Sequence, residues 1–232
     1  MKTVILSGGF GTRLSEETNK IPKPMIKIGN KPIISHIMDC YKSYDYHNFI
    51  LLSGYKKEII KKYYKSRKKV NVVDTGLKTQ TGARIKKIKH LIDQDNFFMT
   101  YGDGLGNVNI NKLLKFHLNN KKIATMTAVR PIARFGSITL KKNKIIKFKE
   151  KDNLQEGWIN GGFFVLNKKI FDYIDDREDC IFERKPLEQL SKDGQLMAYK
   201  HSDFWQPCDT QRDRKFLIEL WNKSNCPWKN YE

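Results

Sequence analysis

Paired cysteines and long apolar runs are both missing from this chain of 232 residues. No apolar run approaches the roughly 20 residues needed to cross a bilayer, and no basic-then-apolar leader precedes the first predicted strand. The four cysteines are scattered without a Cys-x-x-Cys pair, which argues against a zinc site and against a disulfide framework. We therefore expect a soluble, cytoplasmic protein with reduced thiols and no membrane partner.

Acidic residues are also scarce: the chain has 25 Asp and Glu residues against 44 Lys and Arg residues, and its formal net charge is +19. Such a charge suggests a nucleic-acid-binding module as one interpretation. The lysines are spread along the whole chain, however, and no aromatic-rich RNA-binding string accompanies the one dense basic block, 56–69. We expect no nucleic-acid partner, and a positive surface that attracts small polyanionic substrates.

The length fits one α/β domain with a sizeable core. Apolar segments that alternate with amphipathic helices, such as one over 32–44, predict a Rossmann-like, mostly parallel sheet with helices on both faces. The segments expected as its strands are 3–6, 49–53, 70–73, 97–101 and 123–128. Beyond residue 128, the short segments 137–140, 145–149 and 162–166 predict a small antiparallel addition to the sheet, followed by a helical end.

The first predicted strand runs into a turn that contains Gly8, Gly9, Gly11 and Arg13. Glycine lacks Cβ, so successive backbone N–H groups can converge on an oxyanion there, and the arginine adds a cationic fork that matches phosphate. A Walker A loop is excluded because no Gly-Lys-Ser/Thr follows, and the Rossmann fingerprint fails because Leu14 replaces its third glycine. The turn predicts a phosphate cradle of another kind; an ordinary strand-to-helix turn is the alternative.

Two acids and one lysine are candidates for the chemistry that such a cradle would serve. Asp103 directly follows a predicted strand, at the edge where parallel sheets bind ligands, and Asp209 lies in an aromatic segment before a predicted helix. Carboxylates with phosphate oxygens suit Mg²⁺. Lys23 stands between Pro22 and Pro24, which should hold its backbone extended. The alternatives are an Asp-Gly turn, a helix N-cap for Asp209 and a rigid surface loop for Lys23.

The order of these motifs resembles that of the sugar-1-phosphate nucleotidylyltransferases, and in particular the cytidylyltransferases among them. The resemblance rests on Gly8-Gly9-x-Gly11-Thr12-Arg13-Leu14, Pro22-Lys23-Pro24-Met25, Thr81-Gly82-x-Arg84, Tyr101-Gly102-Asp103-Gly104, Arg134-Phe135-Gly136, Glu150-Lys151, Asn160-Gly161-Gly162-Phe163 and Phe204-Trp205-Gln206-Pro207-x-Asp209-Thr210. It implies a GT-A-like α/β fold in one domain, 1–232, with a nucleotide-binding half over 1–128 and a sugar-binding half over 129–232. The implied reaction transfers CMP from CTP to α-D-glucose 1-phosphate, which yields CDP-glucose and pyrophosphate.

The resemblance also implies a role for each residue that matches the family's motifs. Nucleotide binding is implied for Gly8, Gly9, Gly11, Thr12, Arg13, Lys23, Thr81, Gly82 and Arg84. Sugar binding is implied for Arg134, Gly136, Glu150, Lys151, Asn160 and Gly161. Asp103 and Asp209 would hold Mg²⁺, and Arg13, Lys23 and Lys151 would act in catalysis. These cations suit the reaction, because both reactants are phosphate anions that repel one another.

The chain departs from the cytidylyltransferases between Tyr64 and Val73, where it is considerably shorter, and Ala83 stands where glycine is usual. The short segment leaves a homo-oligomer and the choice of CTP over UTP or dTTP open. The choice of phosphorylated acceptor is open too, because few sequence positions decide which pattern of sugar hydroxyls is recognised. A non-catalytic nucleotide sensor is a further alternative. The presence of Arg13, Lys23 and both acids speaks against it.

Overall fold

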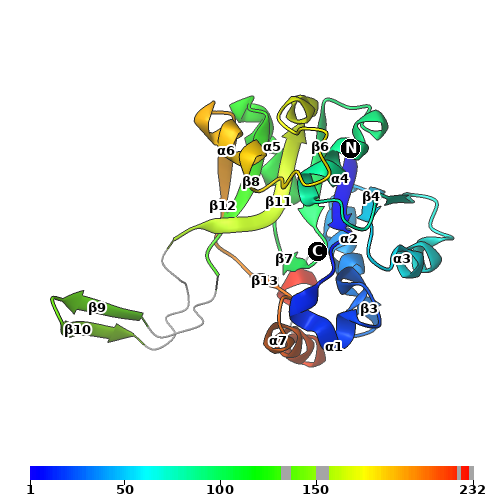
Figure 1. Ribbon diagram of the computed structural model, residues 1–232. Helices are drawn as coiled ribbons and strands as arrows, with labels where there is room; N and C mark the ends of the chain where they lie inside the picture. Colours follow the sequence, from blue (N-terminus) through cyan, green and yellow to red (C-terminus); the bar gives the residue numbers. More distant parts are fainter. Residues whose placement is uncertain (132–136, 150–156, 224–225, 230–232) are drawn as a thin grey trace.

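A seven-stranded sheet of order β12-β8-β11-β6-β1-β4-β5 forms the centre of the computed structural model, which describes residues 1–131, 137–149, 157–223 and 226–229 (Figure 1). Its strands are β1 (Lys2–Ser7), β4 (Asn48–Ser53), β5 (Val70–Asp74), β6 (Asn96–Tyr101), β8 (Ala124–Val129), β11 (Ile159–Asn167) and β12 (Leu196–His201). Neighbouring strands are parallel, except that β11 runs antiparallel to both β6 and β8. The predicted mixed, mostly parallel sheet is confirmed.

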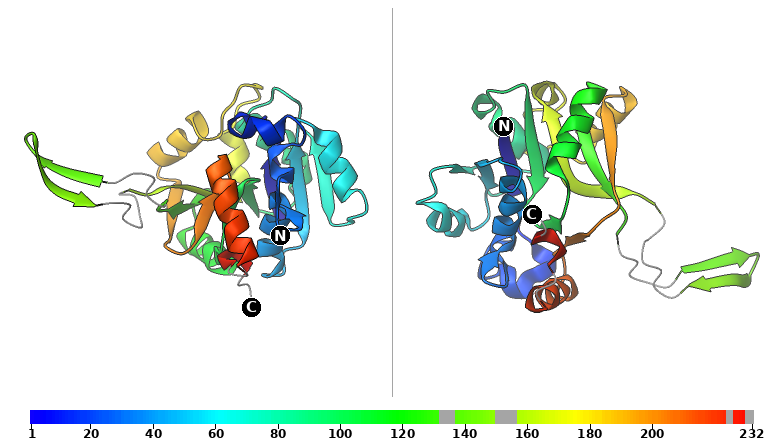
Figure 2. Two further views of the ribbon diagram at one scale, coloured as in Figure 1. Left: turned by 90° about the horizontal axis from the view of Figure 1, so that it is seen from below. Right: turned by 180° about the vertical axis from the view of Figure 1, so that it is seen from behind.

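Helices cover both faces of this sheet, as the two views of Figure 2 show. The helices are α1 (Ser15–Thr18), α2 (Ile33–Lys42), α3 (Lys57–Tyr64), α4 (Thr81–Lys87), α5 (Ile110–Asn120), α6 (Lys185–Lys192) and α7 (Gln211–Asn222). Successive strand residues point to opposite faces, so Ile5 joins the core under α2, α3, α5 and α7, whereas Val4 and Leu6 join the core under α4 and α6. Both cores are apolar, which explains the nearly continuous apolar strands.

Short ladders connect the loops at the carboxyl ends of the strands. β7 (Gly104–Gly106) pairs antiparallel with β13 (Trp205–Pro207), and β2 (Lys27–Ile28) pairs with β3 (Lys31–Pro32). The β7–β13 ladder continues as a hydrogen bond from the Cys208 amide to the Asp103 carbonyl, 2.9 Å. Two segments about a hundred residues apart in sequence are thereby placed side by side.

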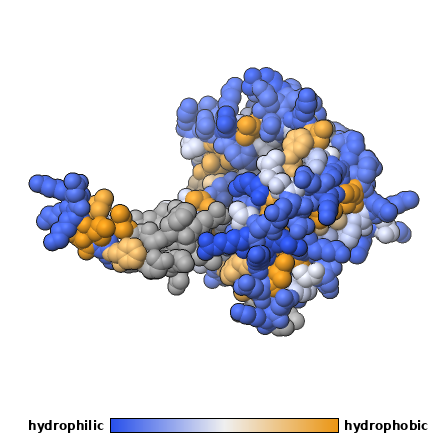
Figure 3. All heavy atoms as spheres, turned by 60° about the horizontal axis from the view of Figure 1, so that its bottom comes forward, coloured by the Kyte–Doolittle hydropathy of each residue, from blue (hydrophilic) through white to orange (hydrophobic). Residues whose placement is uncertain are grey.

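The expected antiparallel addition is only partly right. β9 (Ser137–Lys141) and β10 (Lys144–Lys149) pair with each other in a separate two-stranded sheet and stand away from the body as a hairpin (Figure 1). A register shift between Ile145 and Lys147 puts Ile145 opposite Leu140 and Phe148 on the same face, opposite Ile138. This face is exposed and forms an apolar patch on the hairpin in Figure 3.

The expected helical end is confirmed by α7, but the sequence pattern did not predict β12, which forms one edge of the sheet. Its residues are only partly buried, and Lys200 and Tyr199 interrupt the apolar pattern that marks the central strands. An edge strand is shielded on fewer sides, so its sequence carries a weaker apolar signal. Within the part of the chain that the structure describes, every helix is too short or too polar to span a bilayer.

Two histidines are buried in the cores, where hydrogen bonds hold their rings. His36 accepts a hydrogen bond from the Trp228 indole at Nδ1, 3.2 Å, so its Nε2–H donates to the Ile28 carbonyl, 2.9 Å. His117 is bonded at Nδ1 to the Thr125 hydroxyl, 2.9 Å, and at Nε2 to a side-chain amide oxygen, 3.2 Å. Burial lowers the pKa of both imidazoles to about 4.

This pKa shift predicts a loss of stability in mild acid. Both histidines bind protons more weakly in the folded chain than in the unfolded chain. Their contribution to stability is therefore complete above pH 6.5 and falls as the pH approaches 4. We expect the free energy of unfolding to drop by about 2 kcal/mol per histidine between pH 7 and pH 5, measured by urea denaturation. His36→Gln and His117→Gln should each remove part of this dependence, and His90→Gln, at an exposed position, should not. An unchanged slope in both variants would contradict the assignment.

Candidate functional site

The glycine turn after β1 is closely packed at Gly8 and open at Gly9. A Cβ at Gly8 would lie 2.3 Å from the Arg84 guanidinium, so only glycine fits there. At Gly9 no described atom lies within 4 Å of the position that a Cβ would take, and this residue borders the open cavity. Gly11 has a φ of +67°, which disfavours side chains with a Cβ. The turn can therefore present backbone N–H groups to a ligand without steric obstruction.

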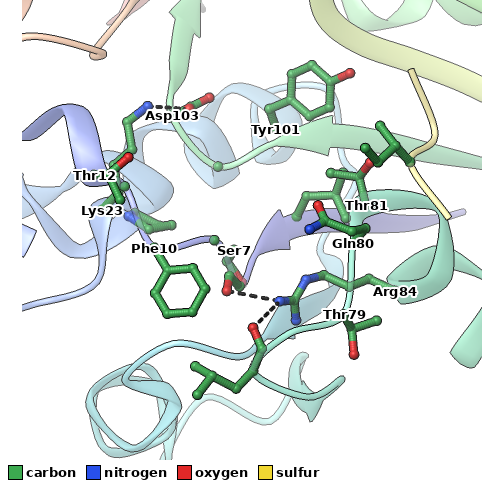
Figure 4. A pocket seen from close by; sticks show the side chains of 18 of the residues that line it. Ser7, Phe10, Thr12, Lys23, Thr79, Gln80, Thr81, Arg84, Tyr101 and Asp103 are labelled. Atoms are coloured by element: carbon green, nitrogen blue, oxygen red, sulfur yellow. Dashed lines mark hydrogen bonds and ion pairs between the residues drawn. The ribbon is translucent and has the colours of Figure 1, made fainter. Parts of the chain in front are cut away.

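Two cavities meet beside this turn. The glycine-loop pocket, about 600 Å³, lies between the turn and the start of α4, and is shown in Figure 4. The Trp205 pocket, about 530 Å³, lies beside the β11 residues Asn160 and Gly161. Arg13, Tyr101 and Asp103 line both cavities, so these residues mark the junction between them. Residues of both expected halves, 1–128 and 129–232, contribute to each pocket.

Four charged side chains gather at this junction. The Lys23 ammonium donates to Asp103 Oδ2 at 2.6 Å and also to Asp209 Oδ1, and the Arg13 guanidinium lies 2.9 Å from Asp209 Oδ2. Burial lowers the pKa of Lys23, but the two carboxylates outweigh this and raise it above its ordinary value. Lys23 therefore stays charged, and the two acids point toward each other from the loops that the β7–β13 ladder joins.

The structure corrects one expectation for Lys23 and excludes one alternative for Asp209. Lys23 begins a 3₁₀ turn, Lys23–Met25, rather than lying in an extended segment, although Pro22 before it is extended. Asp209 is not the N-cap of α7: that residue is Thr210, whose hydroxyl accepts from the Asp213 amide while the Asp213 carboxylate accepts from the Thr210 amide. Asp209 instead pairs with Lys23 and Arg13 in the charged cluster.

The donor set at the junction fits a magnesium ion. Asp103 and Asp209 direct carboxylate oxygens at one cation, the Lys23 ammonium, and Mg²⁺ commonly binds to one or two carboxylates together with phosphate oxygens and water. Among the described residues, no group of three or more His, Cys, Asp or Glu side chains is placed to hold a metal. A metal at this position would therefore complete its coordination with substrate and water.

Arg84 lines the glycine-loop pocket and is held there by several hydrogen bonds to the backbone. Its guanidinium donates to the carbonyls of Gly8 (3.0 Å), Ser53 (3.1 Å), Gly76 (2.8 Å) and Leu77 and to the Thr75 hydroxyl. Figure 4 shows the Arg84 side chain near Ser7 and Thr79, at the opposite end of the pocket from Lys23 and Asp103. Arg84 lines the pocket but uses its terminal N–H groups to tie the glycine turn to the loops after β4 and β5.

The expected site residues that the structure describes lie in the glycine-loop pocket, in the Trp205 pocket or, for Gly82, against Cys180. Gly8, Gly9, Gly11, Thr12, Arg13, Lys23, Thr81 and Arg84 line the glycine-loop pocket. Asn160 and Gly161 line the Trp205 pocket, where the Trp205 indole donates to the Gly161 carbonyl, 2.8 Å. Gly82 packs instead against Cys180, whose Sγ would lie 2.8 Å from an added Cβ. Arg134, Gly136, Glu150 and Lys151 lie outside the described residues.

Sequence reasoning did not identify Glu183 or the hydroxyl of Tyr101 as parts of the site. Tyr101 ends β6 and donates to Glu183 Oε1, 2.6 Å, and Thr81 donates to Glu183 Oε2, 2.6 Å. Both Tyr101 and Glu183 line the glycine-loop pocket. Tyr101 could have been noticed because it directly precedes Gly102-Asp103. Glu183 lies before α6, in a segment whose spacing gives no sign of function.

A cavity bounded by a glycine turn, a second cavity beside it, and cations with paired acids where they meet are features that suit anionic ligands. The chain belongs to the nucleotidyl transferase family, whose model matches residues 2–210, and it is an enzyme of this type. The expected resemblance is thus confirmed.

Individual relatives refine this assignment. The chain is 41% identical to the glucose-1-phosphate cytidylyltransferase of Salmonella typhimurium over 258 aligned positions that cover all of both chains. It is 33% identical to a D-glycero-α-D-manno-heptose 1-phosphate guanylyltransferase of Aneurinibacillus thermoaerophilus, covering 82% of this chain and 84% of the other. Among solved structures, HddC from Yersinia pseudotuberculosis matches with a TM-score of 0.75 and 26% identity, covering 95% of this chain and 99% of that one.

The contacts of Arg84 predict a large structural effect of its replacement. Arg84→Met would remove the donor to the part-buried carbonyls of Gly76 and Leu77, whereas the Gly8 and Ser53 carbonyls keep backbone amide donors. Each unsatisfied buried group costs about 1 to 3 kcal/mol. We expect the free energy of unfolding to fall by about 3 kcal/mol or more in urea denaturation. Arg212→Met removes the same charge from an exposed position of α7 and should have little effect. Equal stability of the two variants would contradict the role of Arg84.

Proposed function

We propose that this chain transfers CMP from CTP to the phosphate of α-D-glucose 1-phosphate, yielding CDP-glucose and pyrophosphate. A phosphate oxygen of the sugar phosphate attacks the α-phosphorus of CTP, and the bond to the departing pyrophosphate breaks. The observation that carries this proposal is the junction of the two pockets, where Arg13, Lys23, Asp103 and Asp209 gather. The 41% identity to a glucose-1-phosphate cytidylyltransferase supports the choice of nucleotide and acceptor.

The chief obstacle to this reaction is the repulsion between two phosphate anions. Two unit charges roughly 4 Å apart repel by about 4 kcal/mol at an effective dielectric constant near 20. Lys23 is buried and held by two acids, which makes its position well defined before substrate binds, whereas Arg13 is largely exposed and can turn toward phosphate. Cations at defined positions stabilise the transition state because little reorganisation is then needed.

We assign the triphosphate of CTP to the glycine turn, through Gly8, Gly9, Gly11, Thr12 and Arg13, and the base to the part of the glycine-loop pocket near Thr81. Asp103 and Asp209 would hold Mg²⁺, which supplies positive charge to the phosphate oxygens when bound. No general base is required, since the sugar phosphate is already ionised at neutral pH. The turn's open side at Gly9 faces the cavity that this assignment requires.

The acceptor belongs in the Trp205 pocket under this proposal. The Asn160 amide and the Gly161 backbone offer polar groups for sugar hydroxyls, and Trp205 supplies an apolar wall. Lys151 would bind the sugar phosphate, and Arg134, Gly136 and Glu150 would bind the hexose, as the family resemblance implies. Asp103 and Arg13 line this pocket too, so the acceptor phosphate would lie beside the charged cluster.

A second candidate keeps the chemistry and changes the substrates. The name of the 33% identical guanylyltransferase specifies a different base and a different sugar, so both substrates vary among relatives of this chain. UTP, dTTP and GTP are therefore tested beside CTP, each with glucose 1-phosphate, mannose 1-phosphate and a heptose 1-phosphate. The readout is pyrophosphate release.

We expect pyrophosphate release to be highest with CTP and glucose 1-phosphate and to require a divalent metal. Preference for another pair would replace the substrate assignment, and release with none of the pairs would contradict the proposed function. Steeply salt-dependent binding of RNA or DNA without pyrophosphate release would favour the nucleic-acid alternative.

Replacement of one metal-holding acid gives a sharper test of the site. Asp103→Asn keeps the size of the side chain but removes a carboxylate, so we expect Mg²⁺-dependent turnover to fall by about 100-fold or more. Asp45→Asn removes the same charge from an exposed turn and should leave turnover unchanged. If Asp103→Asn retains full Mg²⁺-dependent turnover, the metal assignment is wrong.

A further inference from the structure

Glu183 is the end point of two hydrogen-bond chains that come from different sides of the site. On one side, the Phe182 amide donates to Thr81 Oγ1 at 2.9 Å, and the Thr81 hydroxyl donates to Glu183 Oε2 at 2.6 Å. On the other side, Asn160 Nδ2 donates to the Tyr101 hydroxyl at 2.9 Å, and that hydroxyl donates to Glu183 Oε1 at 2.6 Å. Each carboxylate oxygen of Glu183 therefore accepts one hydrogen bond from a hydroxyl group.

The direction of every bond in these chains is determined by chemistry. An N–H group can only donate, so each hydroxyl accepts from the nitrogen before it and has its own proton left for Glu183. Burial, followed by the nearby Glu183 carboxylate, raises the pKa of Tyr101 far above its ordinary value, so the phenol keeps this proton. Asn160 Oδ1 accepts from the Gly162 amide, 2.8 Å, which sets the orientation of the Asn160 amide.

The network crosses from one pocket to the other. Thr81 and Glu183 line the glycine-loop pocket, Asn160 lines the Trp205 pocket, and Tyr101 lines both. Figure 4 shows Tyr101 above Thr81, on the same side of the glycine-loop pocket. A chain of short bonds therefore joins the place assigned to the nucleotide with the place assigned to the sugar.

The surrounding backbone holds the network in this arrangement. Gly162 has a φ of +79°, and a Cβ there would lie 2.6 Å from the Tyr101 ring, so the ring packs directly on the β11 backbone. The segment before Glu183 is fastened to the start of α4, because the Gln80 amide donates to the Glu178 carbonyl, 2.8 Å, and the Ala83 amide to the Cys180 carbonyl, 3.1 Å. Both branches thus end on anchored elements.

A carboxylate in a pocket for a triphosphate is electrostatically unfavourable unless it meets a particular need. The two hydroxyl donors reach Glu183 at different terminal atoms, and a carboxylate offers an acceptor oxygen at both positions, whereas an amide offers an acceptor at one and an N–H donor at the other. Bonds to a charged acceptor are also stronger than those between neutral groups. This requirement explains glutamate at position 183 in a pocket that otherwise favours positive charge.

We propose that Glu183 is a positioning residue that orients Thr81 on the nucleotide side and, through Tyr101, Asn160 on the sugar side. This inference rests on the proposed function, because it assigns the two branches to the two substrates. Glu183 acts through these partners and takes no part in bond making. Its loss therefore affects both substrates, whereas the loss of one branch affects mainly one.

The test compares the KM values of three variants. Glu183→Gln leaves one acceptor oxygen for two hydroxyl donors, and we expect the KM for CTP and the KM for glucose 1-phosphate each to rise about tenfold or more. Tyr101→Phe removes the sugar-side hydroxyl and should raise chiefly the KM for glucose 1-phosphate. Thr81→Val removes the nucleotide-side hydroxyl and should raise chiefly the KM for CTP.

Glu188→Gln is the matched control, since it removes the same charge from an exposed position of α6 and should leave both KM values unchanged. Thermal denaturation of each variant, and calorimetric binding of CMP and of glucose 1-phosphate alone, separate lost orientation from lost folding. If Glu183→Gln does not fold, the two branch variants still decide the matter through their opposite KM patterns.

The outcomes distinguish this inference from the proposed function. An active wild-type enzyme whose Glu183→Gln variant behaves like Glu188→Gln would overturn the inference alone. The inference also fails if Tyr101→Phe and Thr81→Val raise the same KM to the same extent. A wild-type chain that releases no pyrophosphate with any substrate pair would overturn the proposed function, and the assignment of the two branches with it.

Discussion

The site depends on one partly buried ion cluster, in which the buried Lys23 ammonium lies between Asp103 and Asp209. A buried ammonium is costly without carboxylates around it, and two converging carboxylates repel one another without a cation between them. Each partner therefore needs the other two, although they come from three distant parts of the chain. The β7–β13 ladder and the 3₁₀ turn at Lys23 keep them within reach, and both pockets meet where they do.

Hydrogen bonds from polar side chains fix the positions of the loops around the site, whereas the sheet determines only where each loop begins. Arg84 fastens the glycine turn to two other loops through backbone carbonyls, and Glu183 fastens the start of α4 to the end of β6. Loops at the ends of parallel strands commonly carry function but have little internal regularity. Such directed hydrogen bonds give these loops defined positions, and those of Arg84 are buried or part-buried.

Much of this organisation was predictable because apolar periodicity and strand-end position are local signals. The five main-sheet strands of the first half were predicted within two residues of their observed ends, and Asp103 was singled out because it follows β6. β12 was missed since an edge strand is only partly apolar. The separation of the β9–β10 hairpin from the main sheet was missed as well, because strand propensity does not specify a partner. Thr210 rather than Asp209 caps α7, a choice between adjacent residues that spacing did not resolve.

The sequence by itself determined the alternation of strands and helices, the glycine turn with its arginine, and the family to which the motifs belong, because each is encoded in residues close together along the chain. Only the tertiary structure decided that Lys23 joins two acids, that Arg84 serves the backbone of three loops, and that Glu183 joins two pockets. These facts depend on which distant residues become neighbours. The role of a polar side chain depends on the hydrogen-bond donors and acceptors around it. Those groups come from distant parts of the sequence and meet only in the folded chain.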